Sequence, residues 1–331
     1  MTKILMTSVR PDEEKSIKEF AKDHGIEIQT SPQPFINDEV INMTKGVDGL
    51  VIQQHAKVPD SAYPILKANG LKQITTRTAG VDTINIPLAH ENGLKVTNVP
   101  AYSPRSVAEH ALMQIFRLLR KSYAFDHRVA QNDYRWAGLQ AMELHSATIG
   151  IIGVGRIGGT LAKLLKALDA RVLGYDIKPL EDMEDIVEYV SKEQLLKESD
   201  VVTLHVDLNE TSQGLMTLKD FKLMKPSAGL VNASRGPVVV TQDLITALKD
   251  QQIAAAALDT VEGEEHVFNQ DHRQDGLAAV PLINELHQMD NVILTPHIAF
   301  FTNIAVKNMV DISLEDVLLI LKGQNSPHEF N

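Results

Sequence analysis

The sequence predicts an α/β protein of two domains, each with a parallel sheet covered by helices. Its 331 residues are enough for about two domains of roughly 150 residues each. Short runs rich in Val and Ile alternate with amphipathic segments of helical period along the chain, which is the pattern of parallel sheets. A glycine-rich turn at 153–158 joins one such run to a helix near the middle of the chain. Together these observations predict the fold class.

The first half of the chain shows its own alternation of strand and helix signals. Helices are expected at 11–24 and 62–69, among others, and strands at 3–6, 26–29, 50–53, 72–75 and 95–98. Because this part has no glycine fingerprint, it is expected to form a separate α/β domain. The segment 104–122 then reads as one long helix, because its apolar residues keep near-helical spacing at Val107, Ala111, Ile115 and Leu118.

The second half carries the strand signals of one larger sheet. A strand is expected to begin at Thr148, and further strands are expected at 171–175, 185–189, 201–205, 229–232, 253–258 and 292–295. These are enough to complete a six-stranded doubly wound sheet that starts at the strand before the glycine turn. The least regular segments are 132–146 and 262–276.

The glycine turn is the strongest local signal. In TIGIIGVGRIGG, Gly153, Gly155 and Gly158 follow an apolar strand and open a helix. The first glycine permits a tight turn, the second lets the backbone approach a pyrophosphate, and the third lets helix and strand pack closely. The helix carries its apolar stripe at Leu161, Leu164, Leu165 and Leu168. The arrangement predicts a Rossmann domain that binds a dinucleotide.

An acidic residue at the end of the next strand indicates which dinucleotide is bound. Asp176 lies 18 residues beyond Gly158, close to the ~20 that a ribose-binding carboxylate requires. Its carboxylate would accept hydrogen bonds from the ribose hydroxyls and repel a 2'-phosphate, so NAD is favoured over NADP. The alternative is a glycine turn that only packs a βα unit, with Asp176 as a cap.

Composition excludes several classes of partner and chemistry. The net charge is -11, without a dense run of Lys or Arg, which argues against nucleic acid or an anionic membrane surface as the main partner. The absence of cysteine excludes disulfides, thiol nucleophiles and Cys-ligated metals. No apolar stretch approaches the ~20 residues of a spanning helix. We therefore expect a soluble, cytoplasmic protein that acts on a small molecule.

Chemically active residues follow three successive strands of the second half. Arg235 follows 229–232, an acidic cluster follows 253–258, and His297 follows 292–295. Ligands of open α/β sheets bind at the carboxyl ends of the strands, so these residues are expected to share one rim. The alternatives are an arginine paired to a surface acid, a solvated acidic face and a structural histidine. The acidic cluster consists of Asp259, Glu262, Glu264 and Glu265.

The motifs NVPAYSPRSVAEHAL, GVGRIG, VNASRGP, LDTVEGE and NVILTPHIAFFT occur in this order. The chain thereby resembles the D-isomer-specific 2-hydroxyacid dehydrogenases, most closely the D-lactate and D-2-hydroxyisocaproate dehydrogenases of lactic bacteria. The resemblance implies a catalytic triad of Arg235, Glu264 and His297. Arg235 would bind the carboxylate and carbonyl of a 2-oxo acid, and His297 as imidazolium would donate the proton. Glu264 would stabilise the imidazolium and hold its tautomer.

The resemblance also implies binding residues and domain limits. The substrate carboxylate would meet the backbone amides of Ala79 and Gly80, and Tyr102 and Phe300 would line the substrate pocket. A flavodoxin-like substrate-binding domain would cover 1–101 and 299–331, with a C-terminal helix at about 300–322, and the NAD-binding Rossmann domain would cover 102–298. A homodimer built through the nucleotide domain is implied. The implied cofactor-binding residues are Gly153, Gly155, Arg156, Ile157, Gly158, Asp176, Val206 and Asp259.

Reduction of pyruvate to D-lactate with NADH is the leading function predicted from the sequence. The alternatives are larger substrates such as 2-oxoisocaproate or phenylpyruvate, and a non-catalytic NAD(H)-sensing protein. A phosphoglycerate-type role is less favoured because no regulatory domain follows Phe330.

Several other residues are expected to have structural roles and no part in catalysis. His205 is expected to pack near the cofactor or cap its strand, and Trp136 to be a packing or interface residue. Two positions depart from the family pattern, Asp207 in place of a common Pro and Val240 in place of a common Asp. A metal site is disfavoured against a solvated loop for Glu265, His266, Asp271 and His272, so no metal is expected.

Overall fold

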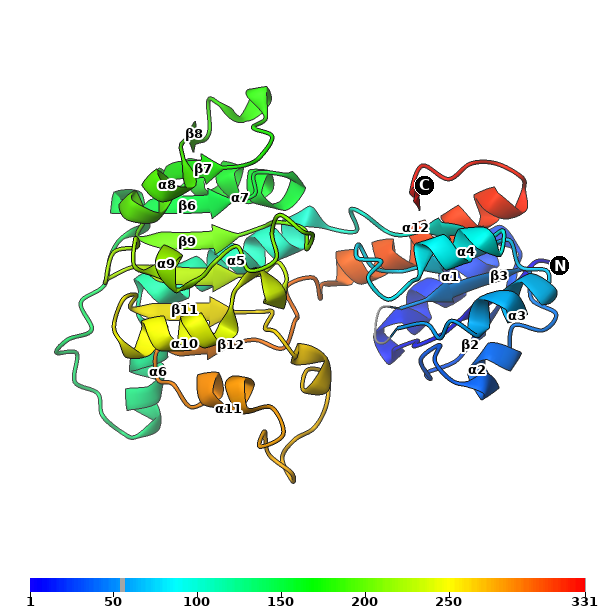
Figure 1. Cartoon of the computed structure of the whole chain (residues 1–331), viewed down its shortest axis with the longest axis horizontal. Coiled ribbons are helices and arrows are strands. Elements are labelled where there is room, and N and C mark those ends of the chain that lie inside the picture. The colour runs from blue at the N-terminus through cyan, green and yellow to red at the C-terminus, as the bar shows by residue number, and fades with distance from the viewer. Residues whose placement is uncertain (54–56, 331) are drawn as a thin grey trace. The chain divides into compact units, whose positions relative to one another are not determined.

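The computed structural model describes residues 1–53 and 57–330 and divides into two compact units. The first unit is Met1–Ser103 with Phe301–Asn331, and the second is Pro104–Phe300. The first unit therefore carries both the blue N-terminal strands and the red C-terminal helix in Figure 1. The chain leaves the first unit after residue 103, where the sequence predicted residue 101. It returns to this unit at residue 301, where the sequence predicted residue 299.

The first unit is built on a sheet whose strand order is β2-β1-β3-β4-β5-β13. The five strands from the N-terminal part are parallel, and β13 runs antiparallel to β5. The order 2-1-3-4-5 is that of flavodoxin-like sheets, as expected. The strands are β1 (Lys3–Met6), β2 (Glu27–Thr30), β3 (Gly49–Ile52), β4 (Gln73–Thr76), β5 (Lys95–Thr97) and β13 (Glu329–Phe330).

Helices cover both faces of this sheet because its strand residues point alternately to each side. Leu5 packs in a cluster with the helices α2 (Asp38–Asn42), α3 (Ala62–Ala68) and α4 (Ile86–Glu91). Ile4 packs in the opposite cluster, with α1 (Glu14–His24) and α12 (Asn303–Leu321). The expected helix at 11–24 thus begins with a 3-10 turn, Pro11–Glu13. The C-terminal helix begins three residues later than expected, where Thr302 accepts a hydrogen bond from the amide of Ala305.

The second unit contains a parallel sheet with the strand order β12-β11-β10-β9-β6-β7-β8. This is the Rossmann order 3-2-1-4-5-6 with one further strand, so the sheet has seven strands within the described residues instead of the six expected. The strands are β6 (Thr148–Ile152), β7 (Arg171–Tyr175), β8 (Glu188–Tyr189), β9 (Val201–Leu204), β10 (Gly229–Asn232), β11 (Ala255–Leu258) and β12 (Val292–Leu294).

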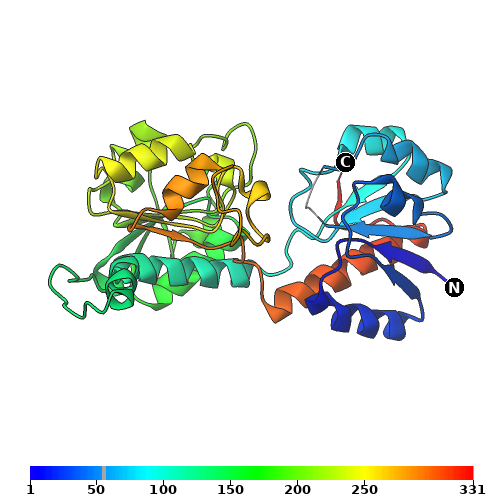
Figure 2. The same ribbon diagram turned by 90° about the horizontal axis from the view of Figure 1, so that it is seen from below.

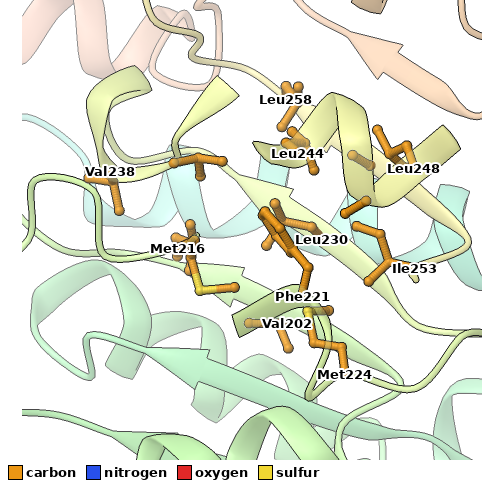
Figure 3. Close-up of a cluster of buried hydrophobic side chains, with 14 of the residues drawn as sticks. Val202, Met216, Phe221, Met224, Leu230, Val238, Leu244, Leu248, Ile253 and Leu258 are labelled. Carbon is orange, nitrogen blue, oxygen red and sulfur yellow. The ribbon is translucent and has the colours of Figure 1, made fainter. Parts of the chain in front are cut away.

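Two layers of helices enclose this sheet (Figure 2). One face is covered by α5 (Pro104–Leu119) and α7 (Arg156–Ala167), and α6 (Ser122–Ala130) follows α5. The other face is covered by α8 (Lys192–Glu198), α9 (Leu218–Phe221), α10 (Thr241–Lys249) and α11 (Pro281–His287). In Figure 3, Leu230 of β10 lies among Phe221, Leu244 and Leu248 from this second layer, and all four are buried.

Two predicted elements are shorter in the structure than expected. The helix expected at 104–122 ends at Leu119, and a second helix begins at Ser122, because Lys121 adopts a left-handed conformation with φ 55°. The strand expected at 185–189 is reduced to Glu188–Tyr189 at the edge of the sheet. The amides of Ile186 and Val187 instead donate to the carbonyl of Met183, so the first part of the apolar run forms a turn. Among the described residues, no helix is both long and apolar enough to span a bilayer.

Candidate active site

The glycine turn between β6 and α7 has the geometry of a nucleotide-binding loop. Gly153 has φ +91°, and a Cβ at this position would lie 2.6 Å from the carbonyl oxygen of His205. A Cβ on Gly158 would lie 2.0 Å from the carbonyl oxygen of Gly153, so only glycine lets the helix start this close to the strand. Gly155 caps α7, is exposed, and has open space where a Cβ would be. A pyrophosphate therefore fits beside Gly155 at the helix N-terminus.

The predicted cofactor residues flank this loop. Arg156 and Ile157 form its first helical turn, and Val206 follows β9 with Cγ1 2.9 Å from the position of a Cβ on Gly153. Asp176 lies directly after β7, where Oδ2 accepts from the amide of Val154 at 2.8 Å and Oδ1 from the amide of Lys178 at 2.8 Å. The backbone thus orients this carboxylate at the edge of the loop, and each oxygen retains a lone pair for a ribose hydroxyl. The residues present fit NAD.

His205 is a neutral, structural part of the same rim. Its Nε2 lies 2.9 Å from the Thr203 hydroxyl, and its Nδ1 is buried without a partner among the described residues. Burial lowers the pKa of His205 to about 4. The ring therefore packs as an uncharged group next to the glycine loop.

The three residues predicted as a catalytic triad follow three adjacent strands, β10, β11 and β12. The loop after β10 is in contact with the loop after β11, because a Cβ on Gly236 would lie 2.3 Å from the backbone carbon of Val261 and 2.4 Å from the amide nitrogen of Glu262. Glycine at 236 therefore sets how closely the segment of Arg235 approaches the segment of Glu264. This contact was not anticipated from the sequence.

Arg235 sits in a loop that its neighbours hold in place. Asn232, the last residue of β10, donates from Nδ2 to the carbonyl of Arg235 at 3.1 Å, and its Oδ1 accepts from the amide and hydroxyl of Ser234. Arg235 Nη1 donates to the carbonyl of Ser234 at 2.8 Å. No carboxylate within the described residues forms a salt bridge with its guanidinium, so the alternative of a surface ion pair is not supported.

His297 and Glu264 form a direct pair. Nδ1 of His297 lies 2.6 Å from Oε1 of Glu264 and donates to it, and Oε2 of Glu264 accepts from the amide of Val261 at 2.8 Å. Both side chains are partly exposed, at 39% for His297 and 21% for Glu264. The pairing fixes which ring nitrogen faces Glu264 and leaves Nε2 as the nitrogen available to a ligand. The neighbouring Glu265 lies beside His266 instead.

Asp259 is the residue that shapes the loop of His297. Its side chain is only 1% exposed. Oδ1 accepts from the amide of Ile298 at 3.0 Å and Oδ2 from the amide of Ala299 at 2.9 Å, while the Asp259 carbonyl accepts from the amide of His297 at 3.0 Å. These bonds hold His297 at φ 53°, a left-handed conformation that is unfavourable for a residue with a Cβ. The sequence predicted that Asp259 binds the cofactor, and this stays a prediction; its hydrogen bonds in the structure are to the loop of His297.

Phe300 connects the loop of His297 to the glycine turn. Its ring meets the imidazole of His297 edge to face, with centroids 6.4 Å apart and planes at 82°. It also packs, with Ile157 of the glycine turn, against a small apolar cluster of Val107, Ala233 and Ala299. An aromatic side chain therefore lies directly against the imidazole of His297.

The remaining predicted substrate residues belong to the first unit. Ala79 and Gly80 follow β4, where Asn98 Nδ2 donates to the Ala79 carbonyl at 2.6 Å and the Thr78 hydroxyl donates to the Gly80 carbonyl at 2.9 Å. Both peptide groups are thus oriented by their carbonyls. The carbonyl of Tyr102 accepts from Asn308 Nδ2 of α12 at 2.7 Å.

A match over the second unit decides the family. Residues 112–299 match the model of the D-isomer specific 2-hydroxyacid dehydrogenase, NAD binding domain. The chain belongs to the D-isomer specific 2-hydroxyacid dehydrogenases. It is an NAD-dependent oxidoreductase, and the glycine turn and Asp176 are consistent with that cofactor.

Full-length relatives agree with this membership. A D-2-hydroxyacid dehydrogenase (NAD(+)) of Clostridioides difficile is 41% identical over 99% of this chain and 100% of its own length. A solved D-lactate dehydrogenase from a Sporolactobacillus species is 52% identical, with a TM-score of 0.88 and coverage of 100% of this chain and 99% of that one. The NAD complex of a D-isomer specific 2-hydroxyacid dehydrogenase from Lactobacillus delbrueckii ssp. bulgaricus is 36% identical, with a TM-score of 0.89 and full coverage of both chains.

Other residues singled out in the sequence take no part in this constellation. Asp271 pairs with Arg273, and within the described residues no three His, Asp or Glu side chains gather as a metal site. Trp136 is 87% exposed, so it does not pack inside this unit, and its role at an interface stays a prediction. Val240 is the N-cap of α10, and the carbonyl of Asp207 accepts from the hydroxyl of Ser212.

Proposed function

We propose that this enzyme reduces pyruvate to D-lactate with NADH, using Arg235, Glu264 and His297 as its catalytic residues. The observation that carries the proposal is the 2.6 Å hydrogen bond between His297 Nδ1 and Glu264 Oε1, at the sheet rim where the loop of Arg235 meets the loop of Glu264. A histidine paired with a carboxylate, and an arginine in the adjoining loop, suit the chemistry of a 2-oxo acid.

Each residue has a distinct task in this proposal. NADH, when bound, supplies the hydride to the ketone carbon. The guanidinium of Arg235 binds the substrate carboxylate through paired hydrogen bonds and faces the negative charge that develops on the carbonyl oxygen. His297 donates the proton to that oxygen from Nε2, since Nδ1 is engaged with Glu264. Glu264 stabilises the imidazolium, and in the reverse reaction neutral His297 accepts the proton.

Three residues of the first unit are also proposed to bind the substrate. Ala79 and Gly80 would offer backbone amides to the substrate carboxylate, and the side chain of Tyr102 would contact the substrate. The bonds from Asn98 and Thr78 support this assignment because they hold the two peptide groups in fixed orientations. Asp259 is proposed to have two roles. It binds the cofactor, as the resemblance implies, and it holds the loop of His297 through its hydrogen bonds to the backbone.

The choice of pyruvate is favoured by the full-length similarity to a Sporolactobacillus D-lactate dehydrogenase and by the bulky Phe300 beside His297. The test compares initial rates of NADH oxidation with pyruvate, 2-oxoisocaproate and phenylpyruvate, and analyses the product of pyruvate on a chiral column. We expect the highest kcat/KM with pyruvate and only the D-isomer. A higher kcat/KM for a branched or aromatic acid would reassign the substrate, and no turnover of any would refute the proposed activity.

A cytoplasmic homodimer is the proposed assembly. Its support is that exposed apolar side chains recur along α5, α6 and the segment that follows. These residues are Met113, Phe116, Phe125, Val129, Tyr134, Trp136 and Met142. Light scattering should give a dimer for the wild-type enzyme and a larger monomer fraction for a Phe116→Glu, Trp136→Ser variant. A wild-type monomer would refute the assembly, and cell fractionation tests the compartment.

A further inference from the structure

A chain of polar side chains leads from α5 to the loop of His297. Arg117 Nη1 donates to Gln114 Oε1 at 3.3 Å, and Gln114 Nε2 lies 3.1 Å from His110 Nε2. His110 Nε2 in turn lies 3.2 Å from the hydroxyl of Thr295, which donates to Asp259 Oδ1 at 2.6 Å. All of these residues belong to the second unit. This series of linked side chains therefore ends at the Asp259 carboxylate, which accepts hydrogen bonds from the amides of Ile298 and Ala299.

Several of these linked side chains are buried, which increases the free-energy cost of losing their hydrogen bonds. Gln114 and Asp259 are each 1% exposed, and the side chain of His110 is 9% exposed. Hydrogen bonds in such surroundings are stronger than at the surface, and a buried group left without its partner is costly. Burial also lowers the pKa of His110, and Asp259 acts in the opposite direction. A neutral His110 whose Nε2 accepts from the Gln114 amide lets the Thr295 hydroxyl donate to Asp259.

We propose that Thr295 and His110 are positioning residues for catalysis: through Asp259 they hold the left-handed turn that presents His297 to the substrate. The inference rests on the proposed function, because it takes His297 as the proton donor. Both residues lie next to a carboxylate that accepts two hydrogen bonds from the backbone directly after His297.

The geometry explains why a hydroxyl and an imidazole are needed. Oδ1 of Asp259 accepts hydrogen bonds from both the amide of Ile298 and the hydroxyl of Thr295, so the hydroxyl helps to fix the orientation of the carboxylate. His110 Nε2 also lies 3.4 Å from Asp259 Oδ1, so loss of the hydroxyl would leave the carboxylate facing the lone pair of this nitrogen directly. The carboxylate would then turn away from the amides at 298 and 299, and His297 would be released from its unfavourable conformation.

Matched variants distinguish the effect of losing a hydrogen-bonding group from the effect of changing the size of the side chain. Thr295→Val removes the hydroxyl at constant size, and Thr295→Ser keeps it. His110→Phe removes the ring nitrogen, and His110→Gln can place an amide oxygen, which accepts as Nε2 does, near the same point. We expect Thr295→Val and His110→Phe to lower kcat about 10- to 100-fold with the KM for the 2-oxo acid and the Kd for NADH within about threefold of wild type. Thr295→Ser and His110→Gln should recover most of kcat.

Hydrogen exchange provides a measurement that needs no turnover. In Thr295→Val and His110→Phe, the amides of Ile298 and Ala299 should exchange about 10-fold faster than in wild type, with unchanged exchange in β6 and α7 as the internal control. Thr295→Ser should exchange like wild type. Exchange at 298 and 299 that is the same in Thr295→Val and wild type would overturn the inference, as would a folded Thr295→Val enzyme with wild-type kcat.

The two hypotheses fail in different ways. If wild-type enzyme turns over no 2-oxo acid, the proposed function is wrong, and the exchange rates still decide whether Thr295 and His110 hold the loop. If wild type is active and Thr295→Val keeps both kcat and amide protection, only the positioning role is wrong. Should His110→Phe fail to fold, the Thr295→Val and Thr295→Ser pair decides the matter.

Discussion

Replacing Gly236 by Ala tests whether the contact between two loops sets the catalytic geometry. The added Cβ would lie 2.3 Å from the backbone carbon of Val261, where ordinary contacts begin at 3.4 Å. Because the opposing atoms belong to the backbone, no side chain can rotate away, and the loops must separate by about 1 Å, the difference between 3.4 and 2.3 Å. A misplacement of about 1 Å in an active site costs on the order of 100-fold in rate.

We therefore expect Gly236→Ala to lower kcat/KM for the 2-oxo acid about 100-fold while the Kd for NADH stays within about threefold of wild type. Steady-state kinetics and NADH fluorescence titration measure the two quantities. Gly229→Ala is the matched control at the opposite end of β10, where the new Cβ would meet Cδ1 of Leu118 at 2.9 Å. That clash involves a movable side chain, so it should cost at most about 1–3 kcal/mol of stability and leave kcat/KM intact.

Wild-type kcat/KM in a folded Gly236→Ala enzyme would refute the reasoning, since the loops would then tolerate separation without loss of function. An equal loss in Gly229→Ala would also refute it, because the effect would then be a general consequence of overpacking the strand.

Three further predictions concern the proton donor, the cofactor and pH. His297→Gln should lose at least about 100-fold in kcat with NADH affinity retained, and ordinary rates in this variant would exclude His297 as the proton donor. Asp176→Ala should narrow the ratio of kcat/KM for NADH over NADPH, and an unchanged ratio would mean that the ribose is recognised elsewhere. Burial lowers the pKa of His205 from 6.5 to about 4, so the unfolded chain takes up a proton at a higher pH than the folded protein does. Folding stability should therefore fall as pH drops from about 6.5 to about 4, by roughly 3 kcal/mol at most, and be unaffected by this group above about pH 7. Denaturant unfolding of wild type and His205→Gln across this range measures the difference, and parallel pH profiles for the two proteins would contradict the assignment.

The regular elements were largely predictable because their signals are local. Strands such as Arg171–Tyr175 and Gly229–Asn232 coincide with apolar runs, and the Rossmann and flavodoxin-like sheets were both expected. The break at Lys121 was not, since the helical stripe of α5 continues to that point and a left-handed residue leaves no mark in the pattern. The shortened edge strand at Glu188–Tyr189 was missed because an apolar run also suits a buried turn.

For the site, residue type and spacing indicated the glycine turn and its acid, and nominated Arg235, Glu264 and His297. They did not indicate that Asp259 would accept hydrogen bonds from the amides after His297. They also did not indicate that Thr295 would donate to Asp259, or that His110 would lie next to Thr295. The only available signal for His110 was its place in the AEHAL motif.

What the sequence determined by itself is the set of local conformations and the chemistry carried at strand ends, because periodicity, glycine turns and strand–helix alternation act over a few residues. The tertiary structure decided which of those ends become neighbours. The order β12-β11-β10 brings together loops that lie tens of residues apart, and the approach of Gly236 to Val261 and the bonds of Asp259 follow from that order. Contacts of this kind depend on packing between distant segments, and no short stretch of sequence contains them.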